Sequence, residues 1–461
     1  NLGDPNLSSN VIWNAEYQEQ CTILIKPKSS YLIKMIAQRE NVPIEFIGFV
    51  SNTGNIEVIN KNDKIKTPIN LNLRDVLNNI PTKYYYLNVK HRPLFDLHAK
   101  PENFILYLEE ILQRIDVGSK RFLTNKVDRS VSGLIAQQQC VGPFQVPLSN
   151  YSITSLGFFN DKGIVASIGE QPLKGLVDIN SSIDMAVGEM LTNLVFSKIT
   201  KFEEIKCLGN WMWSPKIEGE GYLLYLAGVR CVDLLKQLEI GIDGGKDSLS
   251  MNTKIKDKVV MSPNTFVISC YVLTDNMSLK VTPDLKSDNS SIIFIDLAYE
   301  NYRVGGSQLG VILNNLGSDA PTFMNPHKFK QVFMIIQELI KQERILSGHD
   351  RSDGGLITTL IEMSISSPFG ISIDIDNKYS RETDPVSYFM NEELGLVIEV
   401  DNNDVDNILE MISLHCPCYI IGKTNKTNDI SVEFNKTKIL NNKRTYYWNL
   451  WEKTSFKLDE K

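Results

Sequence analysis

The sequence predicts an α+β protein with more than one domain. Its 461 residues exceed the roughly 100 to 200 residues of an ordinary domain, and 42% of them are hydrophobic, enough for two or more cores. Runs with the apolar spacing of a helix alternate with short strand-like runs. A strand–helix–strand module also occurs twice. These three observations favour mixed or antiparallel sheets backed by helices.

Composition argues against several kinds of partner. The chain carries 48 Lys and Arg against 55 Asp and Glu, a net charge of −7, without the Lys/Arg-rich run that a nucleic acid would require. No apolar run reaches about 18 residues, so no transmembrane helix is expected. Seven scattered cysteines without a CxxC pair indicate a reducing compartment and no zinc site. Without a signal peptide at the start, a cytoplasmic location is expected.

An internal repeat organises the chain. Residues 18–58 resemble residues 392–432 without a gap, and matched positions are separated by 422 − 48 = 374 residues. The matches include Glu19 with Glu393, Pro43 with Pro417, Gly48 with Gly422, Thr53 with Thr427, Ile56 with Ile430 and Val58 with Val432. Each copy has the pattern of a strand, an amphipathic helix, a strand, a turn and a last short strand. So long an offset indicates duplication of a whole multi-domain unit.

The repeat suggests five segments. Residues 1–60 would be the tail of a first unit, and residues 61–115 a polar connector with a helical run over residues 104–115. The second unit would divide into residues 116–286 and 287–435 at the polar stretch PDLKSDNSS. The aromatic and charged tail, 436–461, would lead towards another domain. Because the first residue is Asn rather than Met, the chain is interpreted as part of a longer protein.

A predicted helix over residues 181–199 carries the first candidate site. Its Ser-Ser start suits capping, and its apolar stripe consists of Ile183, Val187, Met190 and Leu194. On an adjoining face, Glu189 and Asn193 lie one turn apart, where a carboxylate and an amide oxygen can share one Mg²⁺. The alternative is a Glu and an Asn on a solvated helix edge.

The stretch GHDRSDGGL, residues 348–356, precedes a helical run. Backbone N–H groups at such a helix start attract phosphate, and Asp350 and Asp353 can add to a metal shell. Asp353 as a helix cap is the structural alternative. His349 is a candidate acid, base or phosphate donor, and a structural histidine is the alternative.

Two further stretches offer polar groups beside glycines or prolines. GIDGGKDSLSM, residues 241–251, combines a glycine pair with Lys246 and Asp247, which suits phosphate chemistry, although a tight turn has the same composition. VGPFQVPLSN, residues 141–150, ends in Ser149 and Asn150, which offer oxygen ligands, although an edge strand would look the same. The glycine pair in RVGGSQLGVIL, residues 303–313, cradles an anion or allows close packing.

Together these stretches resemble the formylglycinamidine ribonucleotide synthase family, also called phosphoribosylformylglycinamidine synthase, of the long single-chain type. The motifs that carry the resemblance are SKRFLTNKVDRSVSGLIAQQQCVGPFQVPL, GEQPLKGLVDI, VGEMLTNLVF, NWMWSPKIEGEG, IDGGKDSLSM, VTPDLK, GHDRSDGGL and NEELGLVIEV, in the family's order. It covers almost the whole chain. The repeat agrees with the family's two tandem units of aminoimidazole-ribonucleotide-synthetase type.

The resemblance implies an ATP- and glutamine-dependent ligase of purine biosynthesis. In that family ATP activates the formamide oxygen of formylglycinamide ribonucleotide, and ammonia from a glutaminase domain in the same chain displaces the phosphate. Mg²⁺ and ATP or ADP are the implied cofactors. Residues 116–286 would be the barrel-forming, nucleotide-binding domain, and residues 436–461 would be the linker to the glutaminase domain. The segment alone, without the first unit's nucleotide loop and the glutaminase residues, is expected to be inactive.

The resemblance also assigns site residues. Glu189, Asn193 and Asp350 fall on metal positions of the family, and Ser352 falls on a nucleotide position. Ser149 and Asn150 fall at the end of a stretch where the family usually has an Asp ligand, so Asn150 removes one negative charge. Near the start, Ala15 and Gln20 also depart from the family pattern.

Two other functions are compatible with the same residues. One is a scaffold half of the enzyme in which bound ADP and Mg²⁺ serve folding only. The other is a different synthetase or kinase of the superfamily, such as selenophosphate synthetase. The tandem repeat argues against the latter because those relatives are single units.

Overall fold

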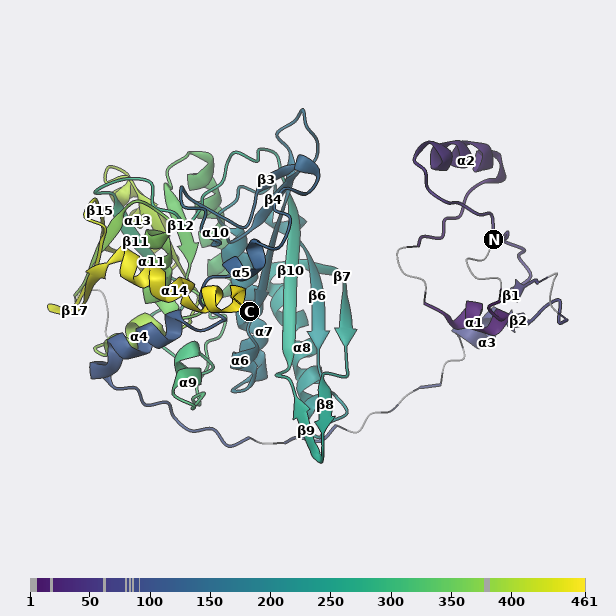
Figure 1. The fold of residues 1–461 in the computed structure, drawn as a ribbon, viewed down its shortest axis with the longest axis horizontal. Helices are drawn as coiled ribbons and strands as arrows, with labels where there is room; N and C mark the ends of the chain where they lie inside the picture. Colours follow the sequence, from purple (N-terminus) through teal and green to yellow (C-terminus); the bar gives the residue numbers. More distant parts are fainter. Residues whose placement is uncertain are drawn as a thin grey trace. The chain divides into compact units, whose positions relative to one another are not determined.

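The computed structural model describes residues 6–16, 20–60, 64–78, 81–82, 84, 87–90, 92–376 and 382–460. The chain divides into two compact units, Asn1–Tyr86 and Leu87–Lys461 (Figure 1). In the described residues, none of the helices combines the length and the apolar character needed to span a bilayer.

The first unit has little core. Its elements are α1 (Ser9–Asn14), η1 (Pro27–Ser29), α2 (Ser30–Arg39), β1 (Asn55–Val58), β2 (Ile69–Asn72) and α3 (Leu73–Leu77). Strands β1 and β2 pair antiparallel. Among its described residues only Ala37 is a buried apolar side chain, whereas Leu24, Ile47 and Phe49 are 83%, 84% and 91% exposed.

The repeat prediction is therefore only partly correct for the first copy. The helix and the last strand form as α2 and β1, but residues 21–26 and 42–50, where two strands were expected, have no strand structure. Strands form only against a neighbour, and in the second copy that neighbour is a central strand. The first unit's described residues offer no such central strand. Glu19, one member of the repeat match, lies outside the described residues.

A six-stranded mixed sheet organises the N-terminal half of the second unit. Its strand order is β3 (Ile135–Gln137), β4 (Ser152–Ser155), β5 (Gly163–Glu170), β10 (Thr265–Thr274), β6 (Lys206–Met212) and β7 (Gly241–Ser248). All neighbours pair antiparallel except β6 with β7. Helix α7 (Ile179–Leu194) packs against β5 and β10, and α8 (Glu220–Leu238) packs beside α7. The outward side chains Ile168 and Leu273 are about half exposed, and β8 (Asn252–Ile255) and β9 (Lys258–Met261) form a separate hairpin.

A seven-stranded sheet organises the C-terminal half. Its order is β12 (Ser347–Asp350), β14 (Gly395–Val400), β11 (Ser291–Asp296), β15 (Cys418–Asn425), β13 (Gly370–Ile375), β16 (Asp429–Phe434) and β17 (Thr437–Lys443). Only β13 and β16 pair parallel. The helices of this half are α9 (Gln308–Ile312), α10 (Pro326–Lys341), α11 (Gly355–Ile365), α12 (Pro385–Met390) and α13 (Val405–Ser413). The second repeat copy forms β14, α13, β15 and β16, as the pattern predicted.

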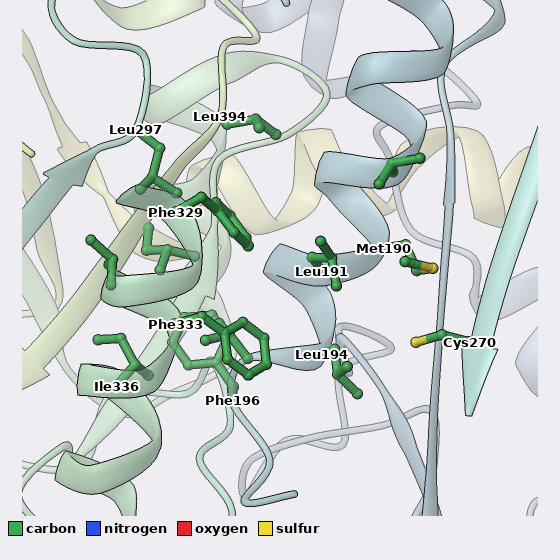
Figure 2. Close-up of a cluster of buried hydrophobic side chains, with 14 of the residues drawn as sticks. Met190, Leu191, Leu194, Phe196, Cys270, Leu297, Phe329, Phe333, Ile336 and Leu394 are labelled. Carbon is green, nitrogen blue, oxygen red and sulfur yellow. The ribbon is translucent and has the colours of Figure 1, made fainter. Parts of the chain in front are cut away.

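One continuous core joins the two halves. The predicted stripe of α7 is fully buried, with Ile183, Val187, Met190 and Leu194 all at 0% exposure. In Figure 2, Leu191 and Leu194 of α7 lie opposite Phe329 and Phe333 of α10, while Met190 lies on the side of Cys270 of β10. Helix α7 is thus held between the six-stranded sheet and the C-terminal half, which fixes the orientation of its polar face.

The two ends of the second unit pack against each other, and the C-terminal end also packs on α11. They form η2 (Pro101–Asn103) with α4 (Phe104–Leu112), and α14 (Arg444–Asp459). The helix predicted over residues 104–115 ends three residues earlier than expected, at Leu112. Within the tail that was expected to lead towards another domain, β17 extends the sheet and α14 buries Tyr447 and Trp451.

The packing of α4 gives a stability prediction. Ile111 is 0% exposed and Leu106 is 52% exposed on the same helix. Ile111→Ala should lower the free energy of unfolding by about 2–5 kcal/mol because it opens a cavity. Leu106→Ala should change it by less than about 0.5 kcal/mol. Urea unfolding followed by tryptophan fluorescence measures both, and equal effects would contradict this packing of α4.

Candidate functional site

Helix α7 positions Glu189 against the end of strand β5. The Glu189 carboxylate accepts hydrogen bonds from the Glu170 backbone N–H at 2.8 Å and from Gln171 Nε2 at 3.1 Å. This approach requires Gly169, because a Cβ there would lie 2.1 Å from the carbonyl oxygen of Ala186. The helix cap is Asp178, which accepts from the N–H groups of residues 180 and 181, so the predicted Ser-Ser cap was wrong. The aspartate before the two serines caps the helix instead, because its carboxylate accepts hydrogen bonds from the free N–H groups of the first turn.

The junction of β12 and α11 carries His349 and Asp350. Gly354 and Gly355 both have positive φ, and a Cβ on Gly355 would lie 2.5 Å from the Phe389 carbonyl oxygen, so this turn requires the glycine pair. His349 Nε2 lies 3.0 Å from a Glu362 carboxylate oxygen, and its Nδ1 lies 3.2 Å from Asp350 Oδ1. The latter pair is an ion-pair contact without hydrogen-bond alignment. Burial lowers the pKa of His349, but the two carboxylates outweigh it and raise that pKa to about 9.

Two separated stretches meet at Asp350. The Asn150 side chain, 9% exposed, donates from Nδ2 to Asp350 Oδ1 at 3.0 Å. Residues 150 and 350 belong to different halves of the unit, so this bond crosses between them. Because the amide nitrogen is used here, the Asn150 carbonyl oxygen is left for another partner. As a neutral amide, Asn150 adds no second negative charge beside Asp350.

Acidic groups gather around this junction. Burial raises the pKa of Glu189 well above its usual range, and the nearby carboxylates of Asp353, Glu170 and Asp350 raise it further. Burial also raises the pKa of Asp353 and of Glu170. In the part of the chain that the structure describes, no three His, Cys, Asp or Glu side chains are close enough to hold a metal ion by themselves. A cation here would therefore need the Asn150 oxygen, water or a ligand's own oxygens as well.

Two lysines balance part of this charge. Lys174 on α6 (Pro172–Gly175) is 1% exposed, and its Nζ donates to Glu392 Oε2 at 2.9 Å. The other oxygen of Glu392 accepts from the N–H groups of Gln308 and Gly354, at 2.9 Å each. Lys120 donates to two backbone carbonyls, and burial lowers its pKa against the opposing effect of Glu362 and Asp353. Sequence reasoning missed both lysines, although each lies inside a motif quoted above.

The glycine pair of residues 305 and 306 serves packing. A Cβ on Gly306 would lie 2.5 Å from Lys174 Cα, and one on Gly305 would lie 2.3 Å from the Asp319 carbonyl oxygen. Of the two readings of RVGGSQLGVIL, the structure favours close packing.

Three further predicted site residues lie close in sequence to the residues described above. Asn193 Nδ2 donates to the Ile168 carbonyl at 3.1 Å. Ser149 donates to the Tyr151 carbonyl beside Asn150. Ser352 lies partly buried in the turn before α11, where its carbonyl accepts from Gly355. These three therefore lie on the same elements as Glu189, Asn150 and Asp350.

Lys246 and Asp247 lie elsewhere. The glycine-rich stretch suited phosphate chemistry or a tight turn, and in the structure residues Gly241–Ser248 form the edge strand β7. Its Gly245 lets β7 approach β6, because a Cβ there would lie 1.9 Å from the Gly209 carbonyl oxygen. In the strand register Lys246 shares a row with Glu170, three strands and roughly 14 Å away. The structure does not bring this pair to the Asn150–Asp350 junction.

Comparisons with known proteins show the family of this chain. Residues 119–273 match the FGAR-AT PurM_N-like domain, and residues 305–435 match the AIR synthase related protein, C-terminal domain. The chain is 40% identical over 99% of its length to the phosphoribosylformylglycinamidine synthase of Dictyostelium discoideum, and 36% identical over 99% to that of Homo sapiens. The chain belongs to the phosphoribosylformylglycinamidine synthase family. It spans 36% of the length of each of these two relatives.

Solved structures show the fold that the family shares. The chain is similar to T. maritima PurL complexed with FGAR, with a TM-score of 0.57, 12% identity, and coverage of 75% of this chain and 53% of that one. The complex of T. maritima PurL with ADP gives a TM-score of 0.54 at 12% identity, covering 75% and 51%. The predicted α+β class with mixed and antiparallel sheets is confirmed.

The buried ion pair between the halves gives a second prediction. Lys174→Met should lower the free energy of unfolding by about 3–5 kcal/mol, because it leaves the Glu392 carboxylate buried without its cation. Adding Glu392→Gln should restore part of that loss. Lys201→Met, which breaks an exposed pair, should cost less than about 1 kcal/mol. Urea unfolding measures the free energy of unfolding of each variant. An unchanged value for Lys174→Met would contradict the assigned pairing.

Proposed function

We propose that this chain supplies the second synthetase-like unit of an ATP- and glutamine-dependent ligase that converts formylglycinamide ribonucleotide to formylglycinamidine ribonucleotide in purine biosynthesis. The observation that carries the proposal is the hydrogen bond between Asn150 and Asp350 across the two halves, with the Glu189 carboxylate near enough for Asp350 to raise its pKa further after burial. The names of the relatives that match 99% of the chain support the reaction.

The donor set fits Mg²⁺. This ion prefers oxygen ligands and usually keeps several waters, so one or two carboxylates and an amide oxygen are sufficient. Glu189 and Asp350 would supply the carboxylates, Asn150 the free amide oxygen, and Asn193 lies one turn from Glu189 as a fourth donor. Burial raises the pKa of Glu189 most, and neighbouring carboxylates raise it further; a divalent cation would offset both effects.

The same junction suits the phosphates of ATP or ADP. The N-terminus of α11 follows Asp350 and Ser352 directly, and helix starts attract anions. Lys120 adds a cation near Asp353 and Glu170. When bound, Mg²⁺ and ATP supply the phosphoryl group that activates the substrate amide, and the charge of the transferred oxygens must be neutralised. The contribution of this chain is to hold that charge in a partly buried site.

A scaffold function for this unit is the second candidate. The neutral Asn150 adds no negative charge to the metal shell, and the Lys174–Glu392 pair ties the same junction into the core. A junction anchored in the core in this way suits a nucleotide that supports folding. In a full-length protein, Glu189→Gln would abolish ligation if the site is catalytic, and would lower only thermal stability if it is structural.

The other components of the reaction would come from the rest of the protein. We infer that a glutaminase domain in the same polypeptide supplies ammonia, and that the protein works in the cytoplasm. The proposed partners are small molecules: formylglycinamide ribonucleotide, ATP and glutamine-derived ammonia. Neither a nucleic acid nor a membrane is among them.

A ligand-binding experiment tests the proposal. Adding Mg²⁺ and ADP at about 100 times the dissociation constant should stabilise the chain by about 2.7 kcal/mol. Glu189→Gln should remove at least about 1.4 kcal/mol of this, a tenfold loss of affinity. Without ligand, the same variant should be as stable as the wild type or more so, because the ionised form of a carboxyl group with a raised pKa costs stability at neutral pH.

Differential scanning calorimetry with and without ligand measures both effects. Glu410→Gln, an exposed glutamate on α13, is the matched control and should change neither. If wild type and Glu189→Gln respond equally to Mg²⁺ and ADP, the proposed site is wrong.

A further inference from the structure

Helix α14 reaches the candidate site through Trp451. This side chain is 1% exposed, and its single N–H is shared between two acceptors, the Val117 carbonyl and Glu362 Oε1, each at 3.1 Å. The Trp451 carbonyl in turn accepts from the Ser119 N–H at 3.0 Å. One residue of α14 therefore holds both a segment beside Lys120 and a carboxylate of α11.

From Glu362 the contacts continue to the proposed metal ligands. Glu362 Oε2 lies 3.0 Å from His349 Nε2, and His349 Nδ1 lies 3.2 Å from Asp350 Oδ1. The same Asp350 oxygen accepts from Asn150 at 3.0 Å. An unbroken series of polar contacts thus runs from α14 to the junction of the two halves.

The segment that carries Lys120 is fixed by the same helix. Arg121 makes a bidentate pair with Glu452, and the Phe122 N–H donates to the Ser455 hydroxyl at 2.8 Å. Gly118 permits this approach, because a Cβ there would lie 2.9 Å from the Trp451 carbonyl oxygen. Two groups expected to face a nucleotide, Lys120 and Asp350, are therefore oriented from α14.

We propose that Trp451 is a positioning residue for the nucleotide site, acting through Glu362 and His349 on Asp350 and through residues 117–119 on Lys120. The inference rests on the proposed function. A purely apolar role would need only the volume of the ring, whereas the shared N–H fixes which way the Glu362 carboxylate faces. Phenylalanine fills most of that volume but leaves the buried Val117 carbonyl and the partly buried Glu362 Oε1 without this donor, so that only His349 still holds the Glu362 carboxylate.

The test compares two hydrogen-bond donors on one helix. Trp451→Phe should weaken binding of Mg²⁺ and ADP about tenfold in isothermal titration calorimetry of the whole chain. Tyr446→Phe removes a donor from the same helix, where the hydroxyl donates to Glu109 on α4 at 2.5 Å, and should leave the dissociation constant unchanged. The melting temperature of each variant without ligand separates a loss of core packing from a loss of affinity.

A double-mutant cycle tests the route. If Trp451 acts through Glu362, combining Trp451→Phe with Glu362→Gln should weaken binding less than the sum of the single effects. Glu362→Gln alone also covers the case in which Trp451→Phe does not fold, because it removes the next link and should weaken binding on its own.

The outcomes separate the two proposals. If the wild-type chain binds no Mg²⁺ and ADP, the proposed function fails and this inference fails with it. If the wild type binds but Trp451→Phe binds equally well with a lower melting temperature, Trp451 only fills the core and this inference alone is overturned. Unchanged binding by Glu362→Gln likewise overturns it.

Discussion

The burial of α7 between two layers is the constraint on which the second unit depends. One side of the helix packs on β5 and β10, and the other side meets α10 and Leu394 of the C-terminal half. Gly188 marks how close that contact is, because a Cβ there would lie 2.6 Å from the Leu394 side chain. With both sides occupied, the helix cannot rotate, and its remaining polar edge presents Glu189 to the end of β5. The candidate site follows from this packing.

Charge then decides what the junction can hold. The two halves bring together more buried carboxylates than their cations balance, and the pKa of Glu189 is raised by burial and by its acidic neighbours as a result. Lys174 donates to Glu392 and Gln171, and Lys120 donates to backbone carbonyls. Asn150 is neutral, so it adds no further negative charge at the point where the two halves touch. What remains suits a hydrated divalent cation that carries a polyphosphate, and that combination would also strengthen the contact between the halves.

Sequence reasoning predicted what local patterns can encode. The apolar stripe of α7, the second repeat copy and the glycine pair before α11 all follow from periodicity and backbone conformation. The turn expected within residues 241–251 proved to be strand β7, because glycine also allows two strands to approach, and Gly209 is over 30 positions away in sequence. The first repeat copy lacked two predicted strands because strands require partners that a local pattern cannot reveal. Lys174, Lys120 and Trp451 were missed because their roles arise only from long-range contacts.

Crystals of the chain grown with ADP and Mn²⁺ in place of Mg²⁺ would test the central claim most directly, because the anomalous signal of manganese locates the ion without reference to the protein. The account predicts a manganese peak about 2.1 Å from a carboxylate oxygen of Glu189 and a similar distance from Asp350, with ADP phosphate oxygens completing the shell. A peak bound to other residues, or ADP bound away from the junction of the two halves, would contradict it.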